Sequence, residues 1–361
     1  MRAAVCVLVA AIGLLAHPAF AQGDRTAAAF WKTVQGACDA TAAKPAGALG
    51  RRIAQTALDE FNRFGGHRID SDGRLFRFGL TEAEHGADDG GDRPVKLGDL
   101  GWWQAMKYWR ALFGDDSTAD KLEMRGYRDA SSATQEAQEA ALLRTSAAAL
   151  LRLVESVSDP EQREMLRESA LRAAVVDTAW SAAFVSYVVR QSGVAENAFR
   201  FSNAHRAYIY DAFATSAAER AKQPDERVYR ACPLTATRPR AGDLICQQRE
   251  PTLSGASDGA VRERIRAELD GGAGTRSVRR THCEVVAHID ARARKVYTIG
   301  GNVNQAVSAR KLNLRRGLKF SASQKGHCGG WTLPQPAADT AQGPVPCSLN
   351  DRKWFVLLQV R

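Results

Sequence analysis

The chain has 361 residues, 45% of them hydrophobic and 25% charged, with a formal net charge of +10. This composition is that of a globular protein and excludes disorder as the main state. The basic excess is modest and no aromatic side chains alternate with the Lys and Arg clusters at 276–280 and 310–316, which argues against a nucleic-acid partner. We expect solvated surface charge, with weak attraction to an anionic polymer such as peptidoglycan as the alternative.

Residues 1–21 have the pattern of a secretory signal peptide. Arg2 precedes an apolar run that ends at Leu15, and Ala19-Phe20-Ala21 has the small-x-small pattern of a cleavage site. No later stretch approaches the ~20 apolar residues that a bilayer crossing requires. The sequence therefore predicts an exported protein, periplasmic or secreted, with no transmembrane segment.

The cysteine content fits an oxidising compartment. Outside the predicted signal peptide there are six cysteines, which are Cys38, Cys232, Cys246, Cys283, Cys328 and Cys347. An even number of cysteines in an exported protein indicates disulfides. Six cysteines can pair in many ways, so spacing alone does not determine the connectivity.

Residues 24–113 have a helical pattern, in which we place an N-terminal segment at 22–50 and the start of the main domain, 51–361. Apolar residues recur at helical spacing on two faces, separated by a loop rich in Gly and Asp at 86–92. These faces carry Ile53, Ala57, Leu58 and Phe61, and Trp102, Met106 and Trp109. We expect both faces to be buried.

The stretch 115–176 is rich in Ala, Leu, Glu and Arg, and it contains no candidate for chemistry. Its apolar residues recur at helical spacing, as at Leu142, Ala149, Leu150 and Leu153. Asp159-Pro160 has the pattern of a helix cap followed by proline at the first helical position. The sequence predicts a helical hairpin, inserted at about 115–170.

Residues 177–190 form the helix with the clearest functional signal. Its buried stripe recurs at every fourth position, at Trp180, Phe184 and Val188. Asp177 or Thr178 could cap the first turn, which places Ser181 at the helix N-terminus. The positive end of the helix dipole favours a nucleophile there, although serine is also a common capping residue.

After Pro233 the pattern changes to strands and turns. We expect strands starting near Asp243, at His282–Asp290, at Lys295–Ile299 and at Lys353–Val360, with a loop insertion at about 250–280 that carries a short helix at Val261–Leu269. Helices followed by antiparallel strands indicate an α+β domain.

His282 and Cys283 cannot act as a base and nucleophile pair, because adjacent residues of a strand point to opposite faces. Cys283 is therefore expected to be structural. His282, Glu284 and His288 share a face, but they match no recognised ligand spacing. We expect no metal and no cofactor.

Several sequence blocks, in this order, resemble the domain of unknown function 2272 (DUF2272) family. They are Trp180–Tyr187, Ser202-x-x-His205-x-x-Tyr208-Ile209, Gly242–Cys246, His282–Val286 and Gly300–Val303. That family in turn resembles the CHAP and NlpC-type papain-like fold, whose members cut peptide or amide bonds in bacterial cell walls. The resemblance runs from about Arg51 to the C-terminus, interrupted by the helical insertion.

The resemblance implies a papain-like α+β domain with N-terminal helices packed on an antiparallel sheet. The CHAP nucleophile, base and orienting residue correspond to Ser181, His282 and Asn302. The CHAP nucleophile is a cysteine, and a serine hydroxyl does not ionise as a thiol does, so it must lose its proton to His282 during attack. Trp180, Ser202, His205 and Tyr208 are candidate groove residues, with Ser202 as a helix cap; His205 and Tyr208 could instead satisfy one another at the surface.

Two functions follow from this resemblance. One is a serine-type hydrolase of peptidoglycan peptides, and the other is a non-catalytic member that binds cell-wall peptide or a periplasmic protein. The sequence leaves the oligomeric state open.

The papain-like sheet also implies a disulfide pairing. The strand after Gly242 would lie antiparallel to the strand that begins at His282, which predicts a Cys246–Cys283 bond. Cys328 and Cys347 bracket a loop rich in Pro and Gly and form the next candidate pair, which leaves Cys38 with Cys232. The alternative for Cys246 and Cys283 is two buried free thiols.

Overall fold

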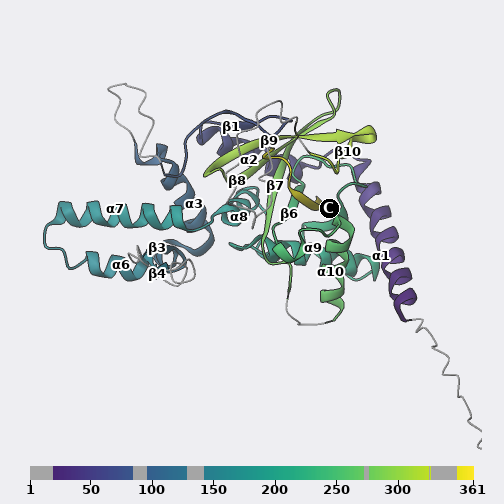
Figure 1. Cartoon of the computed structure of the whole chain (residues 1–361), viewed down its shortest axis with the longest axis horizontal. Helices are drawn as coiled ribbons and strands as arrows, with labels where there is room; N and C mark the ends of the chain where they lie inside the picture. Colours follow the sequence, from purple (N-terminus) through teal and green to yellow (C-terminus); the bar gives the residue numbers. More distant parts are fainter. Residues whose placement is uncertain (1–18, 84–95, 128–141, 272–275, 325, 327–347) are drawn as a thin grey trace, which may run out of the picture.

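The computed structural model describes residues 19–83, 96–127, 142–271, 276–324, 326 and 348–361. It is a mixed α+β structure built around one large sheet (Figure 1). Within these residues no helix is long and apolar enough to span a membrane. The helices packed around this sheet confirm the α+β class predicted from the sequence.

The large sheet is antiparallel except for one pair of strands. Its order is β2 (Leu75–Arg77), β1 (His67–Ile69), β9 (Ala306–Arg315), β8 (Lys295–Val303), β7 (Thr281–Asp290), β6 (Leu244–Gln248), β11 (Lys353–Val360) and β5 (Tyr229–Pro233), with β10 (Lys319–Phe320) paired to β9. Only β1 and β9 run parallel. The predicted strands correspond to β6, β7, β8 and β11, whereas β1, β2, β5, β9 and β10 were not among the predicted strands.

The sheet separates two hydrophobic cores. One face is covered by α2 (Ala48–Arg63), α3 (Gly101–Phe113), α8 (Ser181–Gln191), α9 (His205–Arg220) and α10 (Asp258–Asp270). The other packs against α1 (Ala19–Ala42) through Val34 and Cys38. The predicted apolar faces are buried, except that Leu58 is 38% exposed.

Short 3-10 helices connect the larger elements: η1 (Leu97–Asp99), η2 (Pro251–Leu253) and η3 (Arg316–Leu318). The predicted helix within the 250–280 insertion is present as α10. The β8–β9 hairpin turns at Asn304 and Gln305, both of which have positive φ. This turn positions Asn302 and Val303 at the end of β8.

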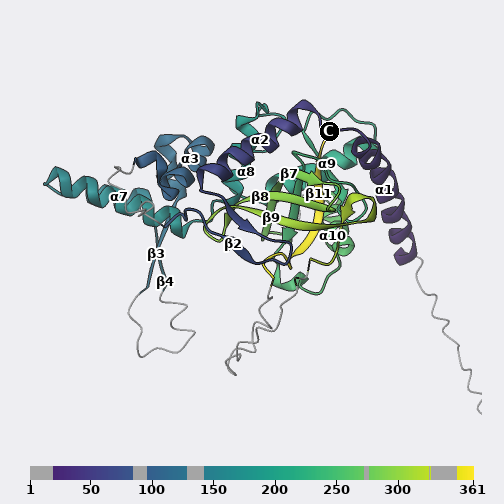
Figure 2. The same cartoon turned by 90° about the horizontal axis from the view of Figure 1, so that it is seen from above.

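The predicted helical insertion contains strands as well as helices. After α4 (Asp115–Lys121), the strands β3 (Glu123–Tyr127) and β4 (Leu142–Ser146) form a two-stranded sheet. The hairpin of α6 (Ala147–Val154) and α7 (Pro160–Asp177) follows and projects from the end of the molecule opposite α1 (Figure 2). The predicted cap is correct, because Asp159 Oδ1 accepts the Gln162 N–H at 2.8 Å. The assignment of Leu142 to a helix was wrong, since β4 pairs it with Tyr127.

Two disulfides join distant parts of the chain. Cys246 and Cys283 lie directly opposite one another on β6 and β7, with Cα atoms 4.1 Å apart, and are bonded as predicted. Cys38 of α1 is bonded to Cys232 of β5. Both bonds fit a secreted or periplasmic protein. Cys328, Cys347 and most of the predicted signal peptide lie outside the described residues.

Candidate functional site

The first turn of α8 is fixed by packing rather than by a side-chain cap. Trp180 is the N-cap and makes no capping hydrogen bond. Asp177 and Thr178 were expected to cap this helix, but their side chains accept backbone N–H groups of β3 at 2.7 and 2.8 Å. The capping prediction was therefore wrong, because the insertion uses both residues to hold β3. Ser181 is the first residue of α8, as the sequence indicated.

Trp180 belongs to the core beneath Ser181. Its ring is fully buried, and its Nε1 donates a hydrogen bond to Glu82 Oε2. A Cβ atom at Gly301 would overlap Trp180 and Phe184, so only glycine lets β8 approach α8 this closely. Burial raises the pKa of Glu82 to about 7. Trp180 therefore positions the start of α8 and does not line an open groove.

Ser181 is hydrogen-bonded to a different histidine from the one predicted. Its Oγ lies 2.8 Å from Nε2 of His205, the first residue of α9. We call Ser181 and His205 the serine–histidine pair. The ring of His205 is 4% exposed, and its Nδ1 contacts the Tyr208 hydroxyl and accepts the Cys283 N–H at 3.3 Å.

The sheet register explains why the Cys283 N–H reaches His205. The short Cα distance between Cys246 and Cys283, 4.1 Å, is that of a non-hydrogen-bonded antiparallel pair, whose N–H groups point away from one another. The ladder between β7 and β8 begins only at Val285, so β8 does not take up this N–H. His205 fills the resulting gap at the start of β7.

The contacts of His205 determine which ring nitrogen carries the proton. A backbone N–H can only donate, so Nδ1 of His205 presents its lone pair to Cys283. Burial, together with the nearby His282 and Arg249, lowers the pKa of His205 well below 6.5 and keeps the ring neutral. The ring proton then resides on Nε2, which donates to Ser181 Oγ.

His282 lies next to the serine–histidine pair without bonding to Ser181. Its ring centroid is 5.0 Å from that of His205. Nε2 is 3.3 Å from Glu284 Oε1, yet neither ring nitrogen forms a hydrogen bond with a described residue. Burial lowers the pKa of His282. The structure thus brings His205 into contact with both Ser181 and His282.

Glu284 anchors the charged groups below His282. Its side chain is fully buried and accepts hydrogen bonds from Thr298 Oγ1 at 2.6 Å and Arg310 Nε at 2.7 Å. Burial alone would raise the pKa of Glu284, but Arg310 and His282 lower it to about 2. Glu284 is therefore ionised and forms an ion pair with Arg310.

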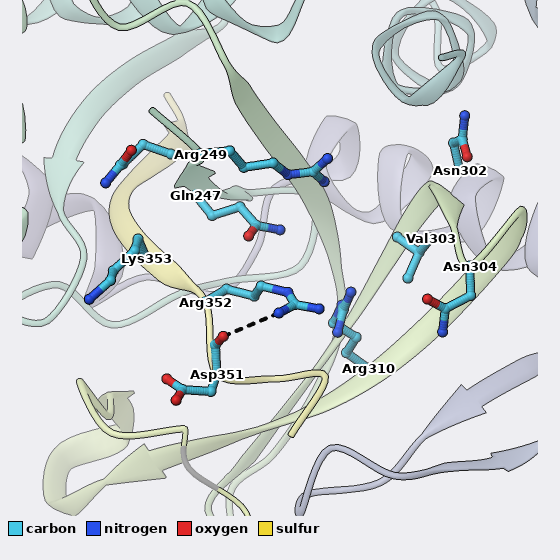
Figure 3. Close-up of a pocket in the computed structure, with 10 residues that line it drawn as sticks. Gln247, Arg249, Asn302, Val303, Asn304, Arg310, Asp351, Arg352 and Lys353 are labelled. Atoms are coloured by element: carbon cyan, nitrogen blue, oxygen red, sulfur yellow. Dashed lines mark hydrogen bonds between the residues drawn. The ribbon is translucent and has the colours of Figure 1, made fainter. Parts of the chain in front are cut away.

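Asn302 lines a cavity of about 660 Å³ at the ends of β6 and β8, beside the middle of β9 and the start of β11. Figure 3 shows the guanidinium groups of Arg249, Arg310 and Arg352 pointing into a common space, with Gln247 between them. We call this the cationic cavity; its lining residues are Gln247, Gln248, Arg249, Asn302, Val303, Asn304, Arg310, Asp351, Arg352 and Lys353. No hydrogen bond in the described part of the chain joins Asn302 to His282.

The other predicted groove residues are structural. Ser202 accepts a hydrogen bond at its backbone oxygen from Ser186 Oγ, at 2.8 Å. Its own Oγ accepts the Ala204 N–H, but α9 begins at His205 with Ala204 as N-cap, so the prediction of Ser202 as the cap was wrong. Tyr208 is buried beneath His205.

The possible metal set does not form. A bulge in β7 between Val286 and His288 turns His288 outward, where it is exposed and packs near Tyr297. Among the residues that the structure describes, no group of three His, Cys, Asp or Glu side chains could hold a metal ion.

A family model described as an uncharacterized protein conserved in bacteria (DUF2272) matches residues 98–360. No curated protein and no solved structure matches the chain. The match includes α8, α9, the serine–histidine pair and the cationic cavity, and it covers well over half of the chain, so the protein belongs to the DUF2272 family.

Proposed function

We propose that this protein is an exported member of the papain-like fold that binds a cell-wall peptide without cleaving it. The observation that carries the proposal is the hydrogen bonding of His205. Its Nδ1 accepts the Cys283 N–H, so its Nε2 donates to Ser181. In this arrangement Ser181 is held as an acceptor and is not deprotonated.

A serine nucleophile requires the opposite arrangement. The base must present a lone pair to the hydroxyl, and a group on its other nitrogen must stabilise the imidazolium that forms. Here the other nitrogen faces a backbone N–H and a tyrosine hydroxyl, and no carboxylate in the described part of the chain accepts from it. The pKa of His205, lowered chiefly by burial, makes protonation unfavourable. The serine–histidine pair is therefore suited to a structural role.

The papain-like assignment rests on the order and placement of the blocks. Ser181 begins α8, and α8 packs on the sheet strands that carry His282 and Asn302. The resemblance assigns the CHAP nucleophile, base and orienting residue to these three residues, with serine replacing cysteine. The two disulfides fit an exported protein that meets the cell wall.

Digestion and binding of purified cell wall test the proposal. We expect the wild-type protein to sediment with wall and to release no soluble peptide or amine, while a CHAP-type hydrolase releases both in the same assay. Ser181→Ala should behave as wild type in both assays. Release of wall fragments by the wild-type protein that disappears in Ser181→Ala would overturn the proposal.

The second candidate function is serine-type hydrolysis. It is favoured by the position of Ser181 at the positive end of α8, 2.8 Å from an imidazole nitrogen. It requires the His205 proton to lie on Nδ1, bonded to the Tyr208 oxygen. NMR of ¹⁵N-histidine-labelled protein distinguishes the tautomers, and we expect Nε2–H for His205, still neutral at about pH 6. A protonated Nδ1 would favour the hydrolase.

A further inference from the structure

We infer that the cationic cavity is a recognition site for a carboxylate-bearing peptide. Arg249, Arg310 and Arg352 would hold the carboxylates, and Gln247 would accept an N–H of the same ligand. The choice of a wall peptide as the natural ligand rests on the proposed function, whereas the binding of carboxylates follows from the cavity alone.

The cavity holds more positive charge than its neighbours balance. Within the described residues, the Arg249 side chain has no hydrogen-bond or ion-pair partner, and that of Arg352 donates only to the Asp351 backbone oxygen at 3.4 Å. The buried carboxylate that contacts Arg310, that of Glu284, is already bonded to its Nε at 2.7 Å. In Figure 3 the carboxylate of Asp351 points away from the three guanidinium groups. Neither Arg249 nor Arg352 therefore has a carboxylate bonded to its guanidinium group, and Glu284 and Asp351 compensate their charge only from a distance.

Electrostatics at the two arginines agree with this description. Partial burial lowers the pKa of Arg249, repulsion by Arg352 and Arg310 lowers it further, and Glu284 offsets part of this shift. Burial and Arg310 also lower the pKa of Arg352, and Glu284 and Asp351 offset part of this shift. A bound anion would relieve this repulsion, and guanidinium groups match carboxylates with paired, parallel hydrogen bonds.

Gln247 supplies the second, independent observation. Its side chain is 1% exposed, and its Oε1 has no hydrogen-bond partner among the described residues. Figure 3 places its amide between Arg249 and Arg352, facing the cavity. A buried amide oxygen without a donor is costly, so it is normally satisfied by protein, water or ligand. A peptide offers a carboxylate and an N–H close together, which matches the arginines and Gln247.

The size of the site fits a short peptide. A volume of about 660 Å³ lies within the usual range for small-ligand sites. Asn302 and Asn304 line the cavity across from Arg249 and Arg352, where their amides can bond a peptide backbone (Figure 3). One ligand can thus contact the arginines and the β8–β9 turn together.

The cavity and Ser181 lie on different faces of the sheet. Gln247 and His282 are cross-strand partners, and they point away from the face that carries the Cys246–Cys283 bond and α8. His205 and His282 therefore separate Ser181 from a peptide in the cavity. This separation agrees with binding without cleavage.

Calorimetric titration of the full chain tests the inference. The probe is a γ-glutamyl tripeptide with free side-chain and terminal carboxylates, compared with the same tripeptide as its carboxamide and with inorganic phosphate. We expect the carboxylate peptide to bind, and the carboxamide to bind at least about tenfold more weakly. Raising the NaCl concentration should weaken binding of the carboxylate peptide, because exposed charges are screened. Equal binding of the carboxamide, or no effect of salt, would overturn the assignment without any variant.

Variants locate the site. Arg249→Gln and Arg352→Gln should each weaken peptide binding about tenfold, since each removes a charged hydrogen bond. Arg292→Gln is the matched control, because Arg292 is an exposed arginine in the β7–β8 turn, at the other end of β7 from His282. Wild-type affinity in the Arg249 and Arg352 variants, with circular dichroism showing that they are folded, would place the ligand elsewhere.

Gln247→Met separates a peptide from a free anion. Methionine keeps the length of the side chain and removes the acceptor, so peptide affinity should fall about fivefold while phosphate affinity is unchanged. Tighter binding of phosphate than of peptide would assign the cavity to phosphate and overturn the peptide assignment. Cleavage of the bound peptide that depends on Ser181 would overturn only the proposed function, and absence of binding by either probe would overturn only this inference.

Discussion

The serine–histidine pair and the cationic cavity lie on either side of His282, and they differ in how their polar groups are satisfied. Around Ser181, the ring nitrogens of His205 are bonded to Ser181, Tyr208 and Cys283. In the cavity, Gln247 Oε1 and the side chain of Arg249 have no partner among the described residues. The polar groups around Ser181 are therefore satisfied within the protein. Those in the cavity would gain partners only from a bound ligand.

This difference shows why a motif and a site need not coincide. The resemblance assigns Ser181 to the position of a papain-like nucleophile, but the hydrogen bonds of His205 hold Ser181 as an acceptor. The cavity has no sequence motif, but its charges are arranged at a cost to the folded state, as expected for a site shaped by ligand binding. The proposed binding site therefore rests on the location of polar groups without partners and not on the motif.

The largest expected change in the free energy of unfolding is at Glu284, which lies below His282, between the two regions. Glu284→Gln leaves Arg310, which is 4% exposed, without its counter-ion. We expect the free energy of unfolding at pH 7 to fall by about 3 kcal/mol, as for other broken buried ion pairs. Urea denaturation measures it, with Glu196→Gln as control, since Glu196 pairs with Arg190 in an exposed position and should change by about 0.5 kcal/mol at most.

The pH dependence of this effect has a definite sign. The pKa of Glu284 is about 2 in the folded protein, below its ordinary value of 4.5. Its stabilisation is therefore fully present above about pH 4.5 and is lost as the pH falls toward 2. The difference between wild type and Glu284→Gln should shrink over that interval. A difference that is independent of pH would show that the carboxylate charge is not what stabilises the junction.

Local patterns in the sequence were sufficient for much of the fold. Strand and turn patterns identified β6, β7, β8 and β11, whereas the pairing of Cys246 with Cys283 came from the family resemblance and is confirmed by the register of β6 and β7. The β3–β4 sheet could not be predicted in the same way, because Ala, Leu and Arg favour helix and the pairing of these strands is a tertiary effect.

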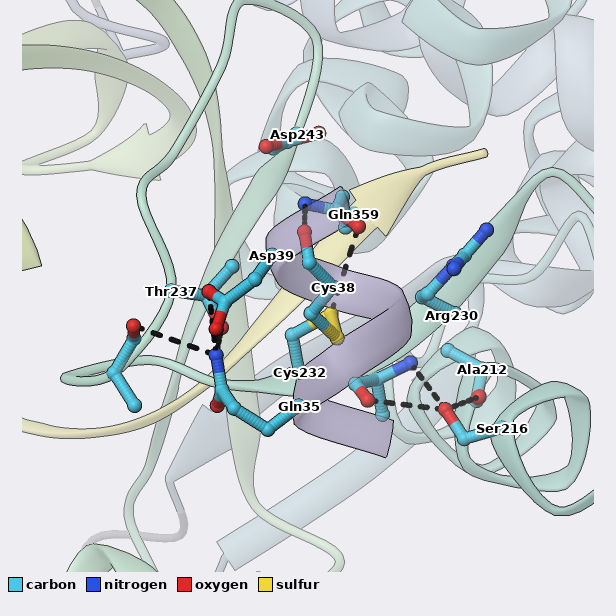
Figure 4. The surroundings of a disulfide bond; sticks show 12 residues. Gln35, Cys38, Asp39, Ala212, Ser216, Arg230, Cys232, Thr237, Asp243 and Gln359 are labelled. Atoms are coloured by element: carbon cyan, nitrogen blue, oxygen red, sulfur yellow. Dashed lines mark hydrogen bonds between the residues drawn. A yellow bond between two sulfur atoms is a disulfide. The ribbon is translucent and has the colours of Figure 1, made fainter. Parts of the chain in front are cut away.

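The Cys38–Cys232 bond was reached only by elimination, because 194 residues separate its ends. Figure 4 shows what brings them together: α1 lies across β5 and β11, where Gln359 Nε2 donates to Cys38 O at 3.0 Å. Gln35 Nε2 also reaches Thr237 Oγ1 at 3.2 Å. These contacts carry no periodic signal in the sequence.

The candidate site was predictable only where a family block carried it. Ser181, His282 and Asn302 were singled out by resemblance, but the bond from Ser181 to His205 joins the starts of two helices and has no characteristic spacing. The cavity arginines come from three separate segments, at the end of β6, within β9 and before β11. In the sequence each of them resembles an ordinary surface arginine, which is why they were assigned to solvated charge or overlooked.

A smaller effect of opposite sign is expected in the first region. Burial raises the pKa of Glu82 to about 7, so the folded protein favours the protonated acid. Wild-type stability should therefore fall as the pH rises from about 4.5 to 7. Glu82→Gln keeps an acceptor for Trp180 Nε1 without the charge, and should raise the free energy of unfolding by about 1 to 2 kcal/mol at pH 8 and by little at pH 5. Glu226→Gln, at an exposed position, should show no such change between the two pH values.

The smallest change in the free energy of unfolding is expected in the cationic cavity. This prediction tests most directly whether the two regions differ. Arg249 is exposed to the cavity and has no described side-chain partner, so Arg249→Gln removes repulsion from Arg352 and Arg310 and breaks no bond. The free energy of unfolding should stay unchanged or rise by about 0.5 kcal/mol, and any gain should disappear at high salt, where exposed charges are screened. Thermal and urea denaturation in low and high NaCl measure this, with Arg292→Gln in parallel. A fall of more than about 1 kcal/mol in the free energy of unfolding would mean that Arg249 supports the fold. The polar groups of the cavity would then be satisfied by the protein itself, as they are around Ser181.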